Sequence, residues 1–158
     1  MKSLEFKNDG LLDSLTGVAA PAIFLESAAR EFASARRDQR PLSILSLRSS
    51  HAPNALTEID LVALARSIQK VLRKEEFFTR ISESGFWIAV RGDVKAGQLL
   101  SQRIFDEFKQ LDEFNQLDEF NQIHAHGDKK QWRASTIECT PLISFDEWIE
   151  SADRIHFN

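Results

Sequence analysis

Residues 77–91 constrain the fold of this chain more than any other stretch. Residues 77–82 are rich in aromatic and β-branched side chains, and residues 86–91 alternate Phe, Ile and Val with Trp, Ala and Arg. The residues at 82–85, Ser-Glu-Ser-Gly, are small or polar and suit a tight turn. Two short β-rich runs joined by such a turn predict a β-hairpin.

The rest of the chain supplies helices and strands that could pack with this hairpin. Each predicted helix starts with a proline, a capping pattern or an apolar repeat of helical period. These helices begin near Pro21, residues 57–60, Val94 and residues 144–147. Further strands are predicted at residues 42–47 and 132–138. This order of elements predicts an α/β (α+β) sandwich, with a central sheet of about five mostly antiparallel strands flanked by helices.

Composition limits the size and the class of the protein. A chain of 158 residues with 42% hydrophobic residues can build one domain with a real core, and is too short for two ordinary domains. A net charge of −4 gives no electrostatic reason to expect binding to nucleic acid or to a membrane surface. One cysteine rules out an internal disulfide framework, and no apolar run is long enough for a spanning helix or a signal peptide. We therefore expect a single-domain cytoplasmic protein.

Residues 105–122 repeat one unit, first as Phe-Asp-Glu-Phe-Lys-Gln and then as Leu-Asp-Glu-Phe-Asn-Gln. Apolar residues recur there at every third position, and on an α-helix such a row turns backwards by roughly 60° at each step. The row therefore cannot stay buried against one sheet. Two interpretations remain open: a duplicated insertion in a peripheral loop or helix end, and a contact with a second copy of the chain.

Several stretches together resemble the GGDEF (diguanylate cyclase) family. Residues 13–17 read Asp-Ser-Leu-Thr-Gly, which matches the family's opening turn, and Phe24 falls where the family has its Phe. The hairpin lies where the family has its signature hairpin, and residues 152–154, Ala-Asp-Arg, resemble the start of the closing helix motif. The resemblance covers about residues 13–157. It implies a GGDEF or nucleotide-cyclase-like domain at residues 13–158, preceded by a lead-in segment at residues 1–12.

The same resemblance implies that the chemistry of the family is missing. Of the five signature positions, Ser82, Glu83, Ser84, Gly85 and Phe86, the last alone fits the family pattern. Active members bind Mg²⁺ through carboxylates at positions that are Arg48 and Ser84 here, and an arginine cannot act as the hard oxygen ligand that Mg²⁺ needs. Ala20 stands where the family's Asn holds the guanine base. We therefore expect a degenerate member with no catalytic residues, no metal and no cofactor.

One family site survives in part. Many members carry an inhibitory site for cyclic di-GMP, and the matching residues here are Arg73, Glu76 and Arg80. An arginine can hold a phosphate or a guanine edge through paired donors, and a carboxylate can accept from guanine N–H groups. The alternative is that Arg73 and Glu76 are solvated charges at a helix end.

Three classes of function follow. The first is a catalytically inactive signalling or protein-interaction module of bacterial cyclic di-GMP signalling, acting through a protein partner or as a homodimer. The second is a cyclic di-GMP receptor that uses Arg73, Glu76 and Arg80. The third, an active diguanylate cyclase, has the weakest support because the metal ligands are replaced.

Overall fold

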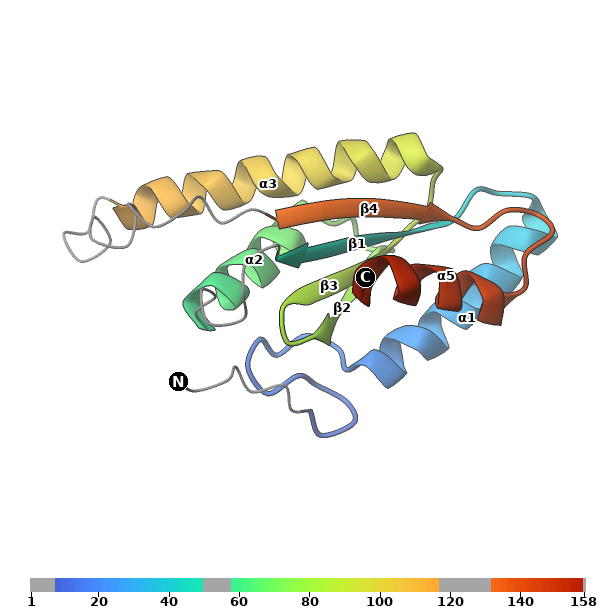
Figure 1. The fold of residues 1–158 in the computed structure, drawn as a ribbon, viewed down its shortest axis with the longest axis horizontal. Coiled ribbons are helices and arrows are strands. Elements are labelled where there is room, and N and C mark those ends of the chain that lie inside the picture. The colour runs from blue at the N-terminus through green and yellow to red at the C-terminus, as the bar shows by residue number, and fades with distance from the viewer. Residues whose placement is uncertain (1–7, 50–57, 117–131, 158) are drawn as a thin grey trace.

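The structure is a computed structural model that describes residues 8–49, 58–116 and 132–157, with the side chains of residues 111–116 and Phe157 left out. Four helices and four strands lie in these ranges (Figure 1). The helices are α1 (Pro21–Asp38), α2 (Glu58–Val71), α3 (Val94–Gln116) and α5 (Phe145–Phe157). The strands are β1 (Ser43–Ser49), β2 (Phe77–Ser82), β3 (Gly85–Val90) and β4 (Trp132–Glu138). The predicted order of elements is confirmed.

The strands form one antiparallel sheet in the order β2-β3-β1-β4. In the part of the chain that the structure describes, the sheet has four strands, where the sequence predicted about five. β2 and β3 form the predicted hairpin, and β1 runs through the middle of the sheet between β3 and β4. The predicted fold class, an antiparallel sheet flanked by helices, is confirmed.

Both faces of the sheet are covered, so the chain builds two cores. Alternate side chains of a strand point to opposite faces, and in β1 Leu45 and Leu47 join α2 and α3 on one face while Ile44 joins α1 and α5 on the other. Figure 1 shows α2 and α3 on one side of the strands and α1 and α5 on the other. Every residue of β3 is buried for this reason. Ser46 and Arg48, two and four residues after Ile44, therefore belong to the α1–α5 face.

The hairpin turns tightly at the predicted place. Ser82 pairs with Gly85, which leaves Glu83 and Ser84 as the turn residues. The backbone N–H of Ser49 donates to the Ser84 carbonyl at 3.0 Å, so the end of β1 is fastened to the turn. The signature positions therefore lie at one end of the sheet, beside the last residues of β1.

The helix ends agree with the sequence in most places. α1 starts at Pro21, and Ser144 caps α5 by accepting from the Glu147 N–H at 3.2 Å. α2 ends at Val71, before the predicted end near Lys74. Thr57, the first residue of the capping pattern at residues 57–60, lies outside the described residues, and so do residues 117–122 of the repeat. Neither interpretation of the repeat is tested.

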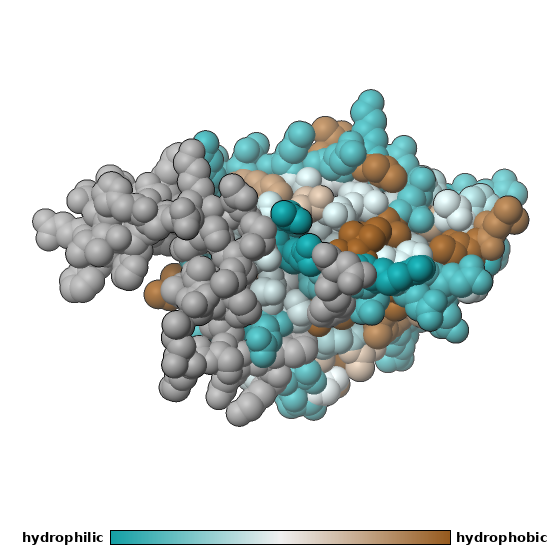
Figure 2. All heavy atoms as spheres, in the orientation of Figure 1, coloured by the Kyte–Doolittle hydropathy of each residue, from teal (hydrophilic) through white to brown (hydrophobic). Residues whose placement is uncertain are grey.

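The surface is polar with separate apolar spots. Among the residues that Figure 2 colours by hydropathy, most are hydrophilic, with apolar residues scattered among them. Within the described ranges, the large apolar side chains that are exposed come from distant parts of the chain: Leu11, Leu12, Ile59, Val94, Leu99, Leu142 and Ile155. Among the helices that the structure describes, none is long and apolar enough to cross a membrane.

Candidate functional site

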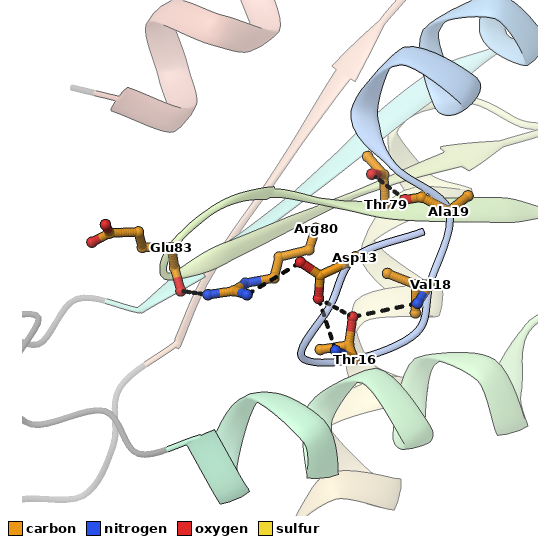
Figure 3. A network of polar contacts seen from close by, with 7 residues as sticks. All are labelled: Asp13, Thr16, Val18, Ala19, Thr79, Arg80 and Glu83. Atoms are coloured by element: carbon orange, nitrogen blue, oxygen red, sulfur yellow. Dashed lines mark hydrogen bonds and ion pairs between the residues drawn. The ribbon is translucent and has the colours of Figure 1, made fainter. Parts of the chain in front are cut away.

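The opening turn, residues 13–17, is held together by Asp13. Its Oδ2 accepts from the Thr16 backbone N–H at 2.8 Å and from the Thr16 hydroxyl at 2.6 Å (Figure 3). The Gly17 N–H donates to the Asp13 carbonyl at 2.9 Å, and Gly17 has φ +74°, a conformation that glycine adopts without strain. Aspartate, threonine and glycine are therefore needed here for the shape of the turn.

The second oxygen of Asp13 reaches the hairpin. Arg80 in β2 forms an ion pair with Asp13 Oδ1 at 3.3 Å, and both side chains are buried, at 0% and 1% exposed. Arg80 Nη2 also donates to the Glu83 carbonyl at 3.0 Å, while the Glu83 carboxylate points away from this network (Figure 3). Next to it, the Thr79 hydroxyl donates to the Ala19 carbonyl at 2.7 Å. This network joins the start of the domain to the signature hairpin.

The three residues predicted to bind cyclic di-GMP do not share one environment. Arg73 is exposed just after α2, and Glu76 is partly buried. The Arg73 N–H donates to Glu76 Oε1 at 2.9 Å and the Glu76 N–H donates to the Arg73 carbonyl at 3.0 Å, so the pair closes a small loop before β2. Arg80 lies in the interior with Asp13. A direct contact from Arg80 to a ligand would require its side chain to leave Asp13.

An open pocket of about 470 Å³ lies between the end of β1, the signature turn (residues 82–85) and the last turn of α5. Its lining consists of polar residues and one isoleucine: Arg48, Ser49, Ile81, Ser82, Glu83, Ser84 and His156. It therefore collects the two positions at which the family has metal ligands, Arg48 and Ser84. The sequence placed these two residues at one site, and the structure brings them together.

His156, from α5, forms the wall of this pocket and is 3% exposed. Its Nδ1 lies 2.6 Å from the Ser46 hydroxyl in β1, and its Nε2 lies 2.9 Å from the Ser82 hydroxyl in β2. The Trp87 ring meets the imidazole edge-on, with ring centroids 6.2 Å apart. Both ring nitrogens therefore have hydroxyl partners, and a serine hydroxyl can act as donor or acceptor to either one.

Gly85, at a signature position, and Arg48, at one of the family's metal-ligand positions, both lie against this histidine. A Cβ atom at Gly85 would lie 2.6 Å from His156 Nε2 and 2.7 Å from the Leu47 carbonyl oxygen, too close for any side chain. Arg48 Nη1 donates to the His156 backbone carbonyl at 2.7 Å. Carbonyls at a helix C-terminus lack partners in the helix and favour a positive charge, so Arg48 is well suited to cap α5.

Burial lowers the pKa of His156 from 6.5 to about 4, and the positive charge of Arg48 acts in the same direction. The imidazole is therefore neutral near neutral pH, with one nitrogen donating and the other accepting. A neutral ring can satisfy both serine hydroxyls without an unpaired charge in the interior.

The residues of this pocket do not fit the magnesium ion that the fold family implies. Mg²⁺ takes hard oxygen ligands, usually carboxylates. At the two family ligand positions this chain has a guanidinium bonded to the end of α5 and a serine, and the carboxylate of Glu83 is the single acidic group in the lining. Among the described residues, no three His, Cys, Asp or Glu side chains form a group that could hold a metal ion.

A scan of the sequence against protein-family models gives no match. A sequence search of curated proteins gives no match either. Structural comparison does find relatives. The chain is similar to the GGDEF domain of DgcB from Caulobacter crescentus, solved in complex with c-di-GMP, with a TM-score of 0.70 and 15% identity over 97% of this chain and 91% of that one. The chain has the GGDEF fold.

Two other solved structures give the same result. A microbial GGDEF domain studied with cyclic di-GMP matches with a TM-score of 0.65 and 17% identity, over 94% of this chain and 88% of that one. The diguanylate cyclase SiaD from Pseudomonas aeruginosa, solved with its activator SiaC, matches with a TM-score of 0.66 and 15% identity, over 92% of this chain and 56% of that one. The family resemblance predicted from residues 13–157 is therefore confirmed at the level of the fold.

Sequence reasoning missed the most connected residue of the site, His156. A signal for it was present: Trp148, Ala152 and His156 follow one another at intervals of four, and the first two are apolar. All three are buried on one face of α5. A histidine on an apolar helix stripe predicts a buried polar partner, although the sequence alone could not indicate that Ser46 and Ser82 would provide it.

Proposed function

We propose that this chain is a catalytically inactive GGDEF-like module of cyclic di-GMP signalling, acting as a signalling or protein-interaction domain. The observation that carries the proposal is the pocket at the signature turn, where Arg48 bonds to the end of α5 in place of a metal ligand. Phosphoryl transfer depends mainly on positioning and on cations that neutralise the developing charge. A pocket that cannot hold those cations removes most of that stabilisation.

The test is an assay for cyclic di-GMP formation from GTP and Mg²⁺, with an active diguanylate cyclase as the positive control. We expect product at the level of the no-enzyme control. Product above that level that disappears when Mg²⁺ is chelated would contradict the proposal, because it would require metal ligands outside the two positions considered.

We expect such a module to act by binding a protein partner. One structural relative, SiaD, is solved in complex with its activator SiaC, so a GGDEF-fold protein can be the target of another protein. A second copy of this chain is another candidate partner, as is cyclic di-GMP.

The receptor function remains the second candidate, because Arg73 and Glu76 lie next to each other at an exposed loop. Relatives with the same fold are solved with c-di-GMP. The exposed guanidinium of Arg73 is available for a phosphate or a guanine edge. Glu76 would have to share its carboxylate with the Arg73 N–H, and Arg80 would assist after leaving Asp13.

Calorimetric titration with cyclic di-GMP tests this second candidate. If the chain binds, Arg73→Ala should weaken binding by about ten-fold or more, since a charge-assisted contact contributes roughly 1.5–3 kcal/mol. Arg73→Lys should also bind poorly, because an ammonium lacks the planar fork. Lys74→Ala removes the neighbouring exposed charge and is the matched control. Equal binding by wild type and both Arg73 variants would place the site elsewhere, and no binding at millimolar ligand would reject the receptor function.

A further inference from the structure

We infer that the last turn of α5 is a latch on the signature turn: His156, seated between Ser46 and Ser82 and over Gly85, couples the position of the helix end to that of the hairpin. The latch forms one wall of the pocket from within the chain. It concerns the same pocket as the proposed function but does not depend on whether the protein is catalytic. Its test therefore measures local opening and not nucleotide chemistry.

The first support is that three separate elements meet at one side chain. His156 belongs to α5, its Nδ1 partner Ser46 belongs to β1, and its Nε2 partner Ser82 belongs to β2. These residues are 110 and 74 positions away from His156 in the sequence. If α5 moved away, a buried hydroxyl and both ring nitrogens would lose their partners together, which is costly in an interior.

The second support is the fit between the hairpin and the ring. Gly85 has no Cβ, and the space that a Cβ would need is filled by His156 and by the Leu47 carbonyl. The imidazole therefore packs directly against the backbone of β3 at the turn. Any movement of the hairpin toward α5 is blocked, and any movement away from it opens a gap beside the ring.

The third support is Arg48. It lines the pocket, and its Nη1 bond to the His156 carbonyl fixes the backbone of the last turn, while the ring bonds fix the side chain. Three departures from the family pattern, at Arg48, Ser82 and Gly85, thus serve one purpose, which is to seat α5. The resemblance to the family implies a carboxylate, a glycine and an acid at these three positions.

The charges around the ring favour the seated position of His156 while the imidazole is neutral. Arg48 on β1 repels a proton on His156, and Glu83 on the turn is exposed at the rim of the same pocket. On β3 the ring contacts the Trp87 ring edge-on, and on β2 it bonds to the uncharged Ser82 hydroxyl. The latch should therefore weaken when the imidazole becomes protonated.

Hydrogen exchange of the full chain, at the amides of residues 82–85 and of residues 153–157, tests the latch. Rates are expressed relative to Ile88, which is buried at the centre of β3. His156→Ala removes the ring, and Gly85→Ala keeps the ring but takes its space. We expect each variant to increase exchange in both segments by about ten-fold or more, since local opening then costs less free energy.

Gly97→Ala is the matched control. Gly97 on α3 is also too close to a neighbour for a Cβ, in this case Thr136, but it lies on the other face of the sheet. This variant should leave the relative exchange of both segments unchanged. Acceleration of one segment without the other, or equal acceleration in Gly97→Ala, would show that α5 and the hairpin open independently and would overturn the latch.

A milder variant keeps the test decisive if His156→Ala fails to fold. Ser82→Ala removes one hydroxyl that is half-buried at the pocket and leaves the ring in place. We expect it to accelerate exchange at residues 153–157 by about three-fold to ten-fold, in proportion to one lost hydrogen bond. No change in that segment would mean that Ser82 does not hold α5, and the latch would be rejected.

Discussion

At the residue scale, the ion pair between Arg80 and Asp13 should contribute strongly to stability. Both side chains are buried, so removing either one takes the opposite charge of the pair away from a group in the interior. We expect Asp13→Ala and Arg80→Ala each to lower the free energy of unfolding by about 3–5 kcal/mol. The double variant should lose less than the sum of the two, because the second removal leaves no charge behind. Urea unfolding measures all three.

The exposed pair of Arg30 and Glu26 on α1 is the control for this prediction. Its side chains are both 68% exposed and its N–O distance is 3.3 Å. Arg30→Ala should cost no more than about 0.5 kcal/mol, as expected for a surface pair one helical turn apart. A similar cost for Arg80→Ala would mean that the buried pair does not organise the hairpin.

His156 gives the protein a pH-dependent stability. Its pKa is about 4 in the folded chain and 6.5 when unperturbed, so between these values the unfolded chain binds a proton and the folded chain does not. The contribution is fully present above about pH 6.5 and is lost as the pH falls through about 4. The loss is at most about 3 kcal/mol.

The comparison with His156→Gln isolates this effect from the carboxylates that titrate in the same range. Glutamine keeps a polar side chain at the site and does not titrate. We expect the stability difference between wild type and variant to shrink as the pH is lowered from 7 to 4.5. A constant difference across that range would show that the pKa of His156 is the same in the folded and the unfolded chain.

Residue roles were the hardest part to predict from sequence. The positions of Arg48 and Ser84 as one site followed from the family pattern. The role of Arg80 did not, because its partner Asp13 lies 67 residues earlier and nothing local indicates that an arginine in a strand is buried. A charged side chain in a strand usually lies at the surface. Here the ion pair with the buried Asp13 carboxylate outweighs that preference.

At the scale of elements, the packing of α3 against β4 limits how much a residue of higher helix propensity can stabilise the protein. Alanine at position 97 would favour the helix by about 1 kcal/mol over glycine. The added Cβ would, however, lie 2.4 Å from the Thr136 side chain, which is too close for a van der Waals contact. We expect Gly97→Ala to lower the unfolding free energy by about 1–3 kcal/mol, since overpacking costs more than propensity gains. Thermal or urea unfolding measures the change.

A second substitution tests the cause. Thr136→Ala removes the atoms that crowd position 97, so the double variant with Gly97→Ala should recover part of the loss. If the double variant is as unstable as the two single changes added together, then crowding at Thr136 is not the reason.

Elements were predicted well where the pattern was local. Residues 77–82 and 132–138 form strands with the predicted bounds, because their β-rich runs end at turns. The alternation in β3 indicated two different faces, and it could not indicate that both are buried. That depends on α1 and α5 covering the second face, which is a property of the whole chain.

At the scale of the whole molecule, the chain shares its fold with solved structures from which its sequence differs widely. The comparison with DgcB reaches a TM-score of 0.70 at 15% identity. Two cores, one on each face of the sheet, need apolar residues of suitable size more than particular identities. The site is different, because its function depends on single residues from β1, the hairpin and α5 that must all match.

This dependence leads to a prediction about restoring the family's metal ligands. The variant Arg48→Asp/Ser84→Asp places carboxylates at both positions, but it also removes the arginine that donates to the His156 carbonyl. A carboxylate beside the end of α5 is unfavourable to the helix dipole, so the thermal midpoint should fall. His156 still packs over Gly85, where a carboxylate cannot be accommodated. We therefore expect no Mg²⁺ binding by calorimetry and no cyclic di-GMP from GTP.

Ser84→Asp alone, which keeps the Arg48 bond, is the control for stability. Millimolar or tighter Mg²⁺ binding by the double variant would mean that the two carboxylates suffice and that α5 does not govern the pocket.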